Sequence, residues 1–233
     1  MMKNINKIIF LSLLITPHLG ISQEKEVPSL LQGVTLKNSE TKKSPIPIET
    51  MFGNEKINYL SIVNFRLGEN SRFGYFGVMT LSIPYQNNDG FNELVFSNAI
   101  TYRLNNKLFV TSGLQYHFLK GIVPYSGIQF LSANPKWLFV ISPSIAFLPN
   151  TSFQSVGIIE YKPKLSKKLR LYTRFQGVYN LNLENGLHER SLVYLRTGIT
   201  LKRTSLGFGF NLDFYGLSKT KHQNLGIFIH RLF

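Results

Sequence analysis

Three arginines share the polar face of two strand-like segments in the last third of the chain. Arg170 and Arg174 alternate with apolar residues along 169–181, and Arg196 does the same along 192–201. Side chains of a β-strand point alternately to its two faces, so we expect all three guanidinium groups on one side of a sheet. Neighbouring strands would bring them close together, and a cluster of positive charge attracts anions.

Two carboxylates, Glu160 and Asp213, occupy the same expected face on the flanking segments. They allow a second interpretation, in which the arginines belong to a structural network that neutralises them. We favour this network over an anion-attracting constriction set by Arg174 and Arg196, because burying a charge without a partner is costly. The five charged residues together are the candidate site.

A second group of reactive residue types lies in one expected loop, where His188, Glu189 and Ser191 are close in sequence. Serine and histidine act as nucleophile and general base in many hydrolases, provided that their side chains lie within hydrogen-bonding reach. Sequence adjacency does not establish that geometry. Lipid hydrolysis is therefore the alternative function, and a non-enzymatic role is the main expectation.

Several other kinds of chemistry are excluded by residue type. The chain has no cysteine, which rules out disulfides, a cysteine-linked lipid anchor and thiol catalysis. Acidic residues are sparse, no histidine spacing is typical of zinc, and no phosphate-binding or dinucleotide loop is present. We therefore expect neither a metal nor a cofactor.

The elements that must position these residues are β-strands. From residue 56 onward apolar and polar residues alternate in about eleven runs of roughly ten residues, separated by short polar turns. In 205–214 every even position is large and apolar, and every odd position is small or polar. One further strand is expected between residues 30 and 52. The total is then about twelve strands, or ten if the runs are divided wrongly.

The final run ends the chain on Phe233. This pattern resembles bacterial outer-membrane β-barrel proteins, whose last strand commonly ends in Phe. The resemblance implies an all-β, up-and-down antiparallel transmembrane barrel, with apolar side chains toward lipid and the five charged residues lining the lumen. It also implies that Phe233 serves as a C-terminal assembly signal. A soluble β-sandwich is the competing architecture, but the links are too short for its Greek-key crossovers.

The first residues of the chain predict export. Lysines at positions 3 and 7, a short apolar run and small residues near Ser22 are typical of a secretory signal peptide over 1–22. Residues 23–55 are charged and rich in proline, which indicates a periplasmic N-terminal tail, with or without the first strand. The barrel is expected over 56–233.

These observations predict an integral protein of the Gram-negative outer membrane, either a narrow porin-like pore or a structural and interaction barrel. The alternative is an outer-membrane lipid-modifying hydrolase. The formal charge of +14 comes without a Lys/Arg block or a nucleic-acid motif. We therefore expect as partners outer-membrane lipids, the barrel-assembly machinery during insertion and a small anionic solute, and no nucleic acid.

Overall fold

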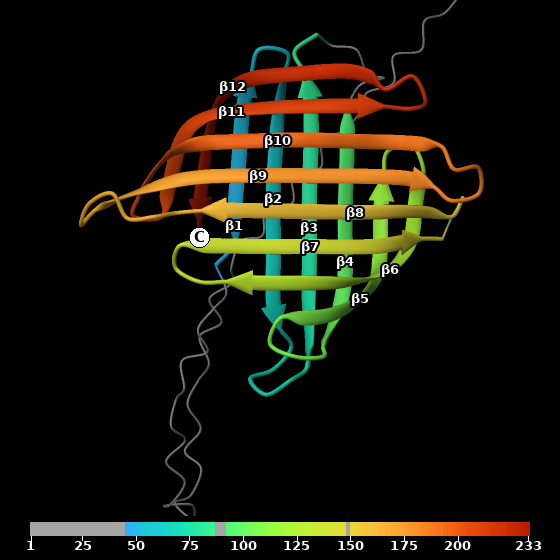
Figure 1. Ribbon diagram of the computed structural model, residues 1–233, viewed down its shortest axis with the longest axis horizontal. Coiled ribbons are helices and arrows are strands. Elements are labelled where there is room, and N and C mark those ends of the chain that lie inside the picture. The colour runs from blue at the N-terminus through green and yellow to red at the C-terminus, as the bar shows by residue number, and fades with distance from the viewer. Residues whose placement is uncertain (1–44, 87–91, 148–149) are drawn as a thin grey trace, which may run out of the picture. The chain divides into compact units, whose positions relative to one another are not determined.

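The computed structural model describes residues 45–86, 92–147 and 150–233, and these form a closed antiparallel barrel (Figure 1). The strands are β1 (Pro47–Gly53), β2 (Lys56–Arg66), β3 (Phe73–Pro84), β4 (Glu93–Arg103), β5 (Leu108–His117), β6 (Gly121–Ala133), β7 (Trp137–Ala146), β8 (Ser152–Tyr161), β9 (Leu169–Asn182), β10 (His188–Leu201), β11 (Thr204–Tyr215) and β12 (Thr220–Leu232). The prediction of an up-and-down all-β barrel of about twelve strands is confirmed. Within the described ranges no helix is long and apolar enough to cross a membrane.

Strand β1 closes the barrel. It pairs with β12 from Pro47↔Leu232 to Gly53↔Gly226, and on its other side it pairs with β2. The barrel therefore begins at Pro47. This residue lies inside segment 23–55, for which the sequence left open whether it contains the first strand. The expected signal peptide over 1–22 and the tail up to residue 44 lie outside the described residues.

Closure removes every free strand edge. Each other strand pairs with its neighbours in sequence, so the order runs once around the barrel without a crossover. The ladder is interrupted between β6 and β7, where no partners occur between Gly127↔Ser144 and Phe130↔Ile141, next to Pro143. Proline has no N–H to donate, which accounts for the gap. A continuous ring is the form that a spanning sheet needs, since lipid offers no hydrogen-bond partners to an edge.

Side-chain alternation gives the barrel an apolar outer wall and a polar interior. On β11 and β12, Leu206, Phe208 and Ile227 are each more than half exposed. Asn211 and Asn224, on the same two strands but on the opposite face, are fully buried. A soluble barrel would have the opposite arrangement. The apolar wall is therefore suited to lipid, and the polar residues are enclosed by it.

Aromatic pairs mark the end of the barrel that carries the chain terminus, which we call the terminal end; the opposite end is the distal end. Trp137 and Tyr161 are cross-strand partners with ring centroids 4.3 Å apart, and Phe73 and Tyr102 are 5.1 Å apart. Aromatic residues at such positions lie at the membrane–water interface of transmembrane barrels. Phe233 also lies here: its backbone N–H donates to the carbonyl oxygen of Ile46 over 3.0 Å.

Deletion of Pro47–Gly53 is expected to prevent barrel formation, because β2 and β12 would each keep an unpaired edge in lipid. The measurement is heat-modifiable migration on a gel after refolding, in which a closed barrel runs differently before and after boiling. Deletion of 24–40, within the expected tail, should leave that shift unchanged. A heat-modifiable product lacking β1 would contradict the prediction.

Candidate functional site: the lumen and its vestibule

The centre of the lumen holds one carboxylate shared by two arginines. Arg174 on β9 and Arg196 on β10 are directly opposite cross-strand partners, an arrangement that is destabilising for like charges. The carboxylate of Glu49 on β1 neutralises both guanidinium groups. Its Oε1 accepts hydrogen bonds from Arg174 Nη2 over 2.7 Å and from Arg196 Nε over 2.8 Å. All three side chains are under 5% exposed. This trio is the central cluster.

A chain of amides extends the central cluster around the wall. Arg196 Nη1 donates to Asn211 Oδ1 over 2.7 Å, and Asn211 Nδ2 donates to Asn58 Oδ1 over 3.0 Å. Asn58 Nδ2 in turn donates to Ser82 Oγ over 2.6 Å, and Asn224 Nδ2 also reaches Asn58 Oδ1, over 2.8 Å. The network thus joins β10, β11, β12, β2 and β3 through side chains alone.

Apolar and aromatic groups fill the space beside this network. Met51, Tyr172 and Phe228 form a buried group, with 5.6 Å between the centroids of the two rings. Gly209 leaves room for them, since a Cβ there would lie 2.8 Å from Met51 Sδ and 3.2 Å from Arg196 Cδ. An inward side chain that lined an open pore would be exposed to water. These three are at most 1% exposed, so the lumen is filled at this level.

The two predicted carboxylates have other partners than expected. Glu160 Oε2 pairs with Lys162 Nζ over 2.6 Å, and its Oε1 accepts from the Tyr172 hydroxyl over 3.2 Å. Asp213 pairs with Arg190 over 2.8 Å and with Lys56 over 3.5 Å. The expectation that these acids neutralise Arg174 and Arg196 is therefore wrong, because Glu49 from across the lumen is closer to both guanidinium groups.

Arg170 lies apart from the other two arginines. Its Nε and Nη2 donate to the backbone carbonyl of Lys162 over 3.1 and 2.9 Å, and Nη2 also donates to the carbonyl of Pro135. These carbonyls belong to turns at the terminal end. The structure therefore brings together Arg174 and Arg196, while Arg170 holds two turns in place.

Sequence reasoning missed Glu49, Arg190 and Glu93. Glu49 was overlooked because its segment was assigned to a tail in which the first strand was only an open alternative, and Ile48, Glu49, Thr50 and Met51 do not alternate between apolar and polar residues. Arg190 Nη2 also binds Glu93 Oε2 over 3.0 Å, and Glu93 Oε1 accepts from the Tyr215 hydroxyl over 2.6 Å. Glu93 thus bridges the lumen from β4 to β10 and β11.

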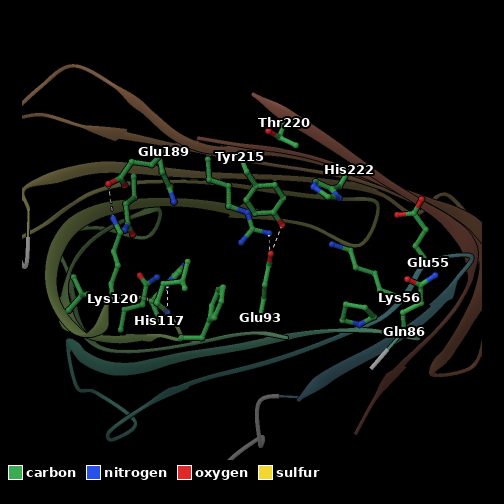
Figure 2. A pocket seen from close by; sticks show the side chains of 18 of the residues that line it. Glu55, Lys56, Gln86, Glu93, His117, Lys120, Glu189, Tyr215, Thr220 and His222 are labelled. Carbon is green, nitrogen blue, oxygen red and sulfur yellow. Dashed lines mark hydrogen bonds and ion pairs between the residues drawn. The ribbon is translucent and has the colours of Figure 1, made fainter. Parts of the chain in front are cut away.

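Above this bridge, a cavity of about 840 Å³ occupies the distal end, and we call it the vestibule. Figure 2 shows Glu93 reaching from one wall toward Tyr215 on the other, with Lys120 and Glu189 joined at one side and Lys56 lying at the other. The Lys120–Glu189 pair is 2.7 Å long and also spans the lumen. Asp213, only 1% exposed, is not among the residues that line the vestibule.

His188, Glu189 and Ser191 lie at the start of strand β10 and not in the expected loop, and their side chains divide between the two faces of the wall. His188 Nε2 lies 3.0 Å from Ser191 Oγ, and His188 Nδ1 lies 2.8 Å from the carbonyl oxygen of Gly216. Ser191 is the cross-strand partner of outward-facing Tyr179, so this pair is on the outer wall. Glu189 instead contacts Lys120 and Ser152 inside the barrel, and it does not join the pair.

Among the described residues, no group of three or more His, Cys, Asp or Glu side chains is placed to hold a metal ion. The lumen is polar and closed around, the wall is apolar, and aromatic pairs flank one end. The chain folds as an outer-membrane β-barrel.

Comparisons with known proteins find similar solved structures and no similar sequence. No family model matches the sequence, and no match is found among curated proteins. Among solved structures, the NanC porin has a TM-score of 0.49 and 10% identity, over 81% of this chain and 99% of that one. The KdgM porin has a TM-score of 0.44 and 9% identity, over 82% and 99%. LpxR from Salmonella typhimurium has a TM-score of 0.42 and 7% identity, over 82% and 100%.

Replacing Glu49 by Gln is expected to lower the free energy of unfolding by about 3–5 kcal/mol, because two adjacent buried guanidinium groups lose their shared carboxylate. Urea-induced unfolding in lipid vesicles measures the change. Glu55→Gln is the matched control, since Glu55 is exposed and makes no ion pair with the described residues. Equal stability losses in the two variants would contradict the role given to Glu49.

Proposed function

We propose that this protein is a non-enzymatic outer-membrane barrel that is closed to ions in the state described, a structural and interaction barrel and not an open pore. The observation that carries the proposal is the filled cross-section around Glu49, Arg174 and Arg196. Ion conduction needs a continuous wet path, whereas Met51 and Phe228 at the same level are completely buried. Outer-membrane lipids would contact the apolar wall.

The electrostatics of the lumen support the same proposal. An anion-selective constriction needs positive potential that faces water. Here the two guanidinium groups are directed at one carboxylate and at Asn211, and each is under 5% exposed. Passage of a small anionic solute would require the Glu49 contacts to part and the buried side chains to move aside.

Planar-bilayer recording tests the proposal, and the wild-type protein is expected to show no steady conductance. The contrast is a triple variant, Glu49→Ala with Arg174→Ala and Arg196→Ala, which removes the central cluster without leaving an unpaired charge. We expect it to fold, as judged by heat-modifiable migration, and to conduct, because water can then enter the emptied space. A steady wild-type current, especially one selective for anions, would overturn the closed barrel in favour of the narrow pore.

Lipid hydrolysis is a second candidate, favoured by the 3.0 Å contact between His188 Nε2 and Ser191 Oγ. A carbonyl can only accept, so His188 Nδ1 donates to Gly216 and Nε2 is free to accept the serine proton. In this candidate reaction Ser191 Oγ attacks a lipid ester carbonyl while Nε2 takes the proton. The imidazolium then protonates the departing alcohol, and water hydrolyses the acyl-enzyme. The outer-wall position gives the pair access to lipid.

The hydrolase candidate predicts that purified protein releases fatty acid from vesicles of ester phospholipid, and that Ser191→Ala reduces the rate at least about a hundredfold, since no nucleophile remains. Released fatty acid is measured by mass spectrometry. Ser218→Ala, in the nearby β11–β12 turn, should retain the full rate. If wild-type protein releases no more fatty acid than empty vesicles do, this candidate is rejected.

A further inference from the structure

Two cross-strand partners in the wall of the vestibule each carry an unpaired polar atom. Arg190 Nε, a donor, and Asn180 Oδ1, an acceptor, are buried without a hydrogen-bond partner in the described part of the chain. Arg190 and Asn180 are cross-strand partners on β10 and β9, and both line the vestibule. A hydroxyl group both donates and accepts, so a ligand that carries hydroxyl groups offers partners of both kinds.

These two residues belong to a row of polar side chains that runs along one wall. Successive register partners on β8 to β12, all lining the vestibule, are Gln154, Asn180, Arg190, Tyr215 and Thr220. Gln154, and Gln115 on β5, make no side-chain hydrogen bond to the described residues. Each primary amide offers donors and an acceptor, which complements a ligand that carries several hydroxyl groups.

The charged groups of the vestibule are balanced in number, and five of the six are paired. Three cations and three carboxylates line it: Lys56, Lys120, Arg190, Glu55, Glu93 and Glu189. Lys120 is bound to Glu189 over 2.7 Å and Arg190 to Glu93 over 3.0 Å, while Lys56 lies 3.5 Å from Asp213. A charged ligand would have to compete with these pairs. The uncommitted amides, by contrast, are available to a neutral ligand.

We propose that the vestibule is a binding site for a neutral, polyhydroxylated ligand, a short saccharide that enters from the distal end. Its volume of about 840 Å³ is within the range of roughly 300–1,000 Å³ typical of ligand sites. The lining rings of Tyr85, Phe118 and Tyr215 add apolar surface for the C–H faces of sugar rings. The proposal does not depend on whether the barrel conducts, and binding and conductance are measured separately.

The experiment is calorimetric titration of the full chain with three neutral trisaccharides, maltotriose, cellotriose and mannotriose, and with acidic trigalacturonate. The detergent must have an amine-oxide headgroup, since a glycoside detergent would compete. At least one neutral trisaccharide is expected to bind saturably, and more tightly than trigalacturonate. The variant Asn180→Leu with Gln154→Leu should weaken it about tenfold, the effect of losing two modest hydrogen bonds.

The matched control is Asn64→Leu, the same change near the terminal end of β2 and outside the vestibule lining. Neither Asn180 nor Gln154 donates or accepts a side-chain hydrogen bond within the described barrel, so the double variant should keep its heat-modifiable shift. The proposal is supported if a neutral trisaccharide binds saturably and its affinity is lowered in the double variant but not in Asn64→Leu. Failure of all three neutral sugars to bind at millimolar concentration, equal weakening by Asn64→Leu, or preference for trigalacturonate would overturn it.

A second arm distinguishes the source of the saccharide. The barrel is placed in phosphocholine vesicles with or without lipid that bears a neutral saccharide headgroup, and the same titration is repeated. If the glycolipid competes with the soluble trisaccharide, the ligand is the headgroup of a membrane lipid. If it does not, the ligand is a free saccharide reaching the distal end from solution.

Discussion

The Glu49 carboxylate binds the guanidinium groups of both Arg174 and Arg196 in a space that is closed to water. Two arginines directly opposite each other on neighbouring strands repel, and burial removes the solvent that would screen them. The two arginines can therefore stay buried and charged only if an anion from the opposite wall binds them. Because β1 also completes the ring of strands, one short element both closes the sheet and supplies the charge that its interior requires.

The filled centre separates the lumen into a closed middle and an open vestibule at the distal end, and the two parts are suited to different roles. At mid-height, hydrogen-bonded amides, Met51 and Phe228 leave no room for a solute, which is the basis for proposing a closed barrel. At the distal end the opposite walls are joined by the ion pairs from Glu93 to Arg190 and from Lys120 to Glu189. The space between these bridges is lined by apolar surface, by charged groups in equal number and by uncommitted amides, so it is suited to binding and not to conduction.

The fold was largely predictable because lipid imposes a simple rule on the sequence. Every spanning strand must alternate between an apolar and a polar face, and the long, clean runs such as β9 and β11 carry this signal over their whole length. Prediction was weakest at β1, which is only seven residues long and is preceded by prolines and charges. A short strand gains its stability from its neighbours, so its own pattern need not be strong.

The sequence by itself determined the type and approximate number of the strands and which residues share a face, since all of these depend on local periodicity. It also placed Arg174 and Arg196 on one face. Only the tertiary structure decided their partner, because Glu49 is more than a hundred residues away and meets them through barrel closure. The same reason applies to the vestibule and to the separation of Glu189 from Ser191: curvature, register and the bulge at the start of β10 set these distances.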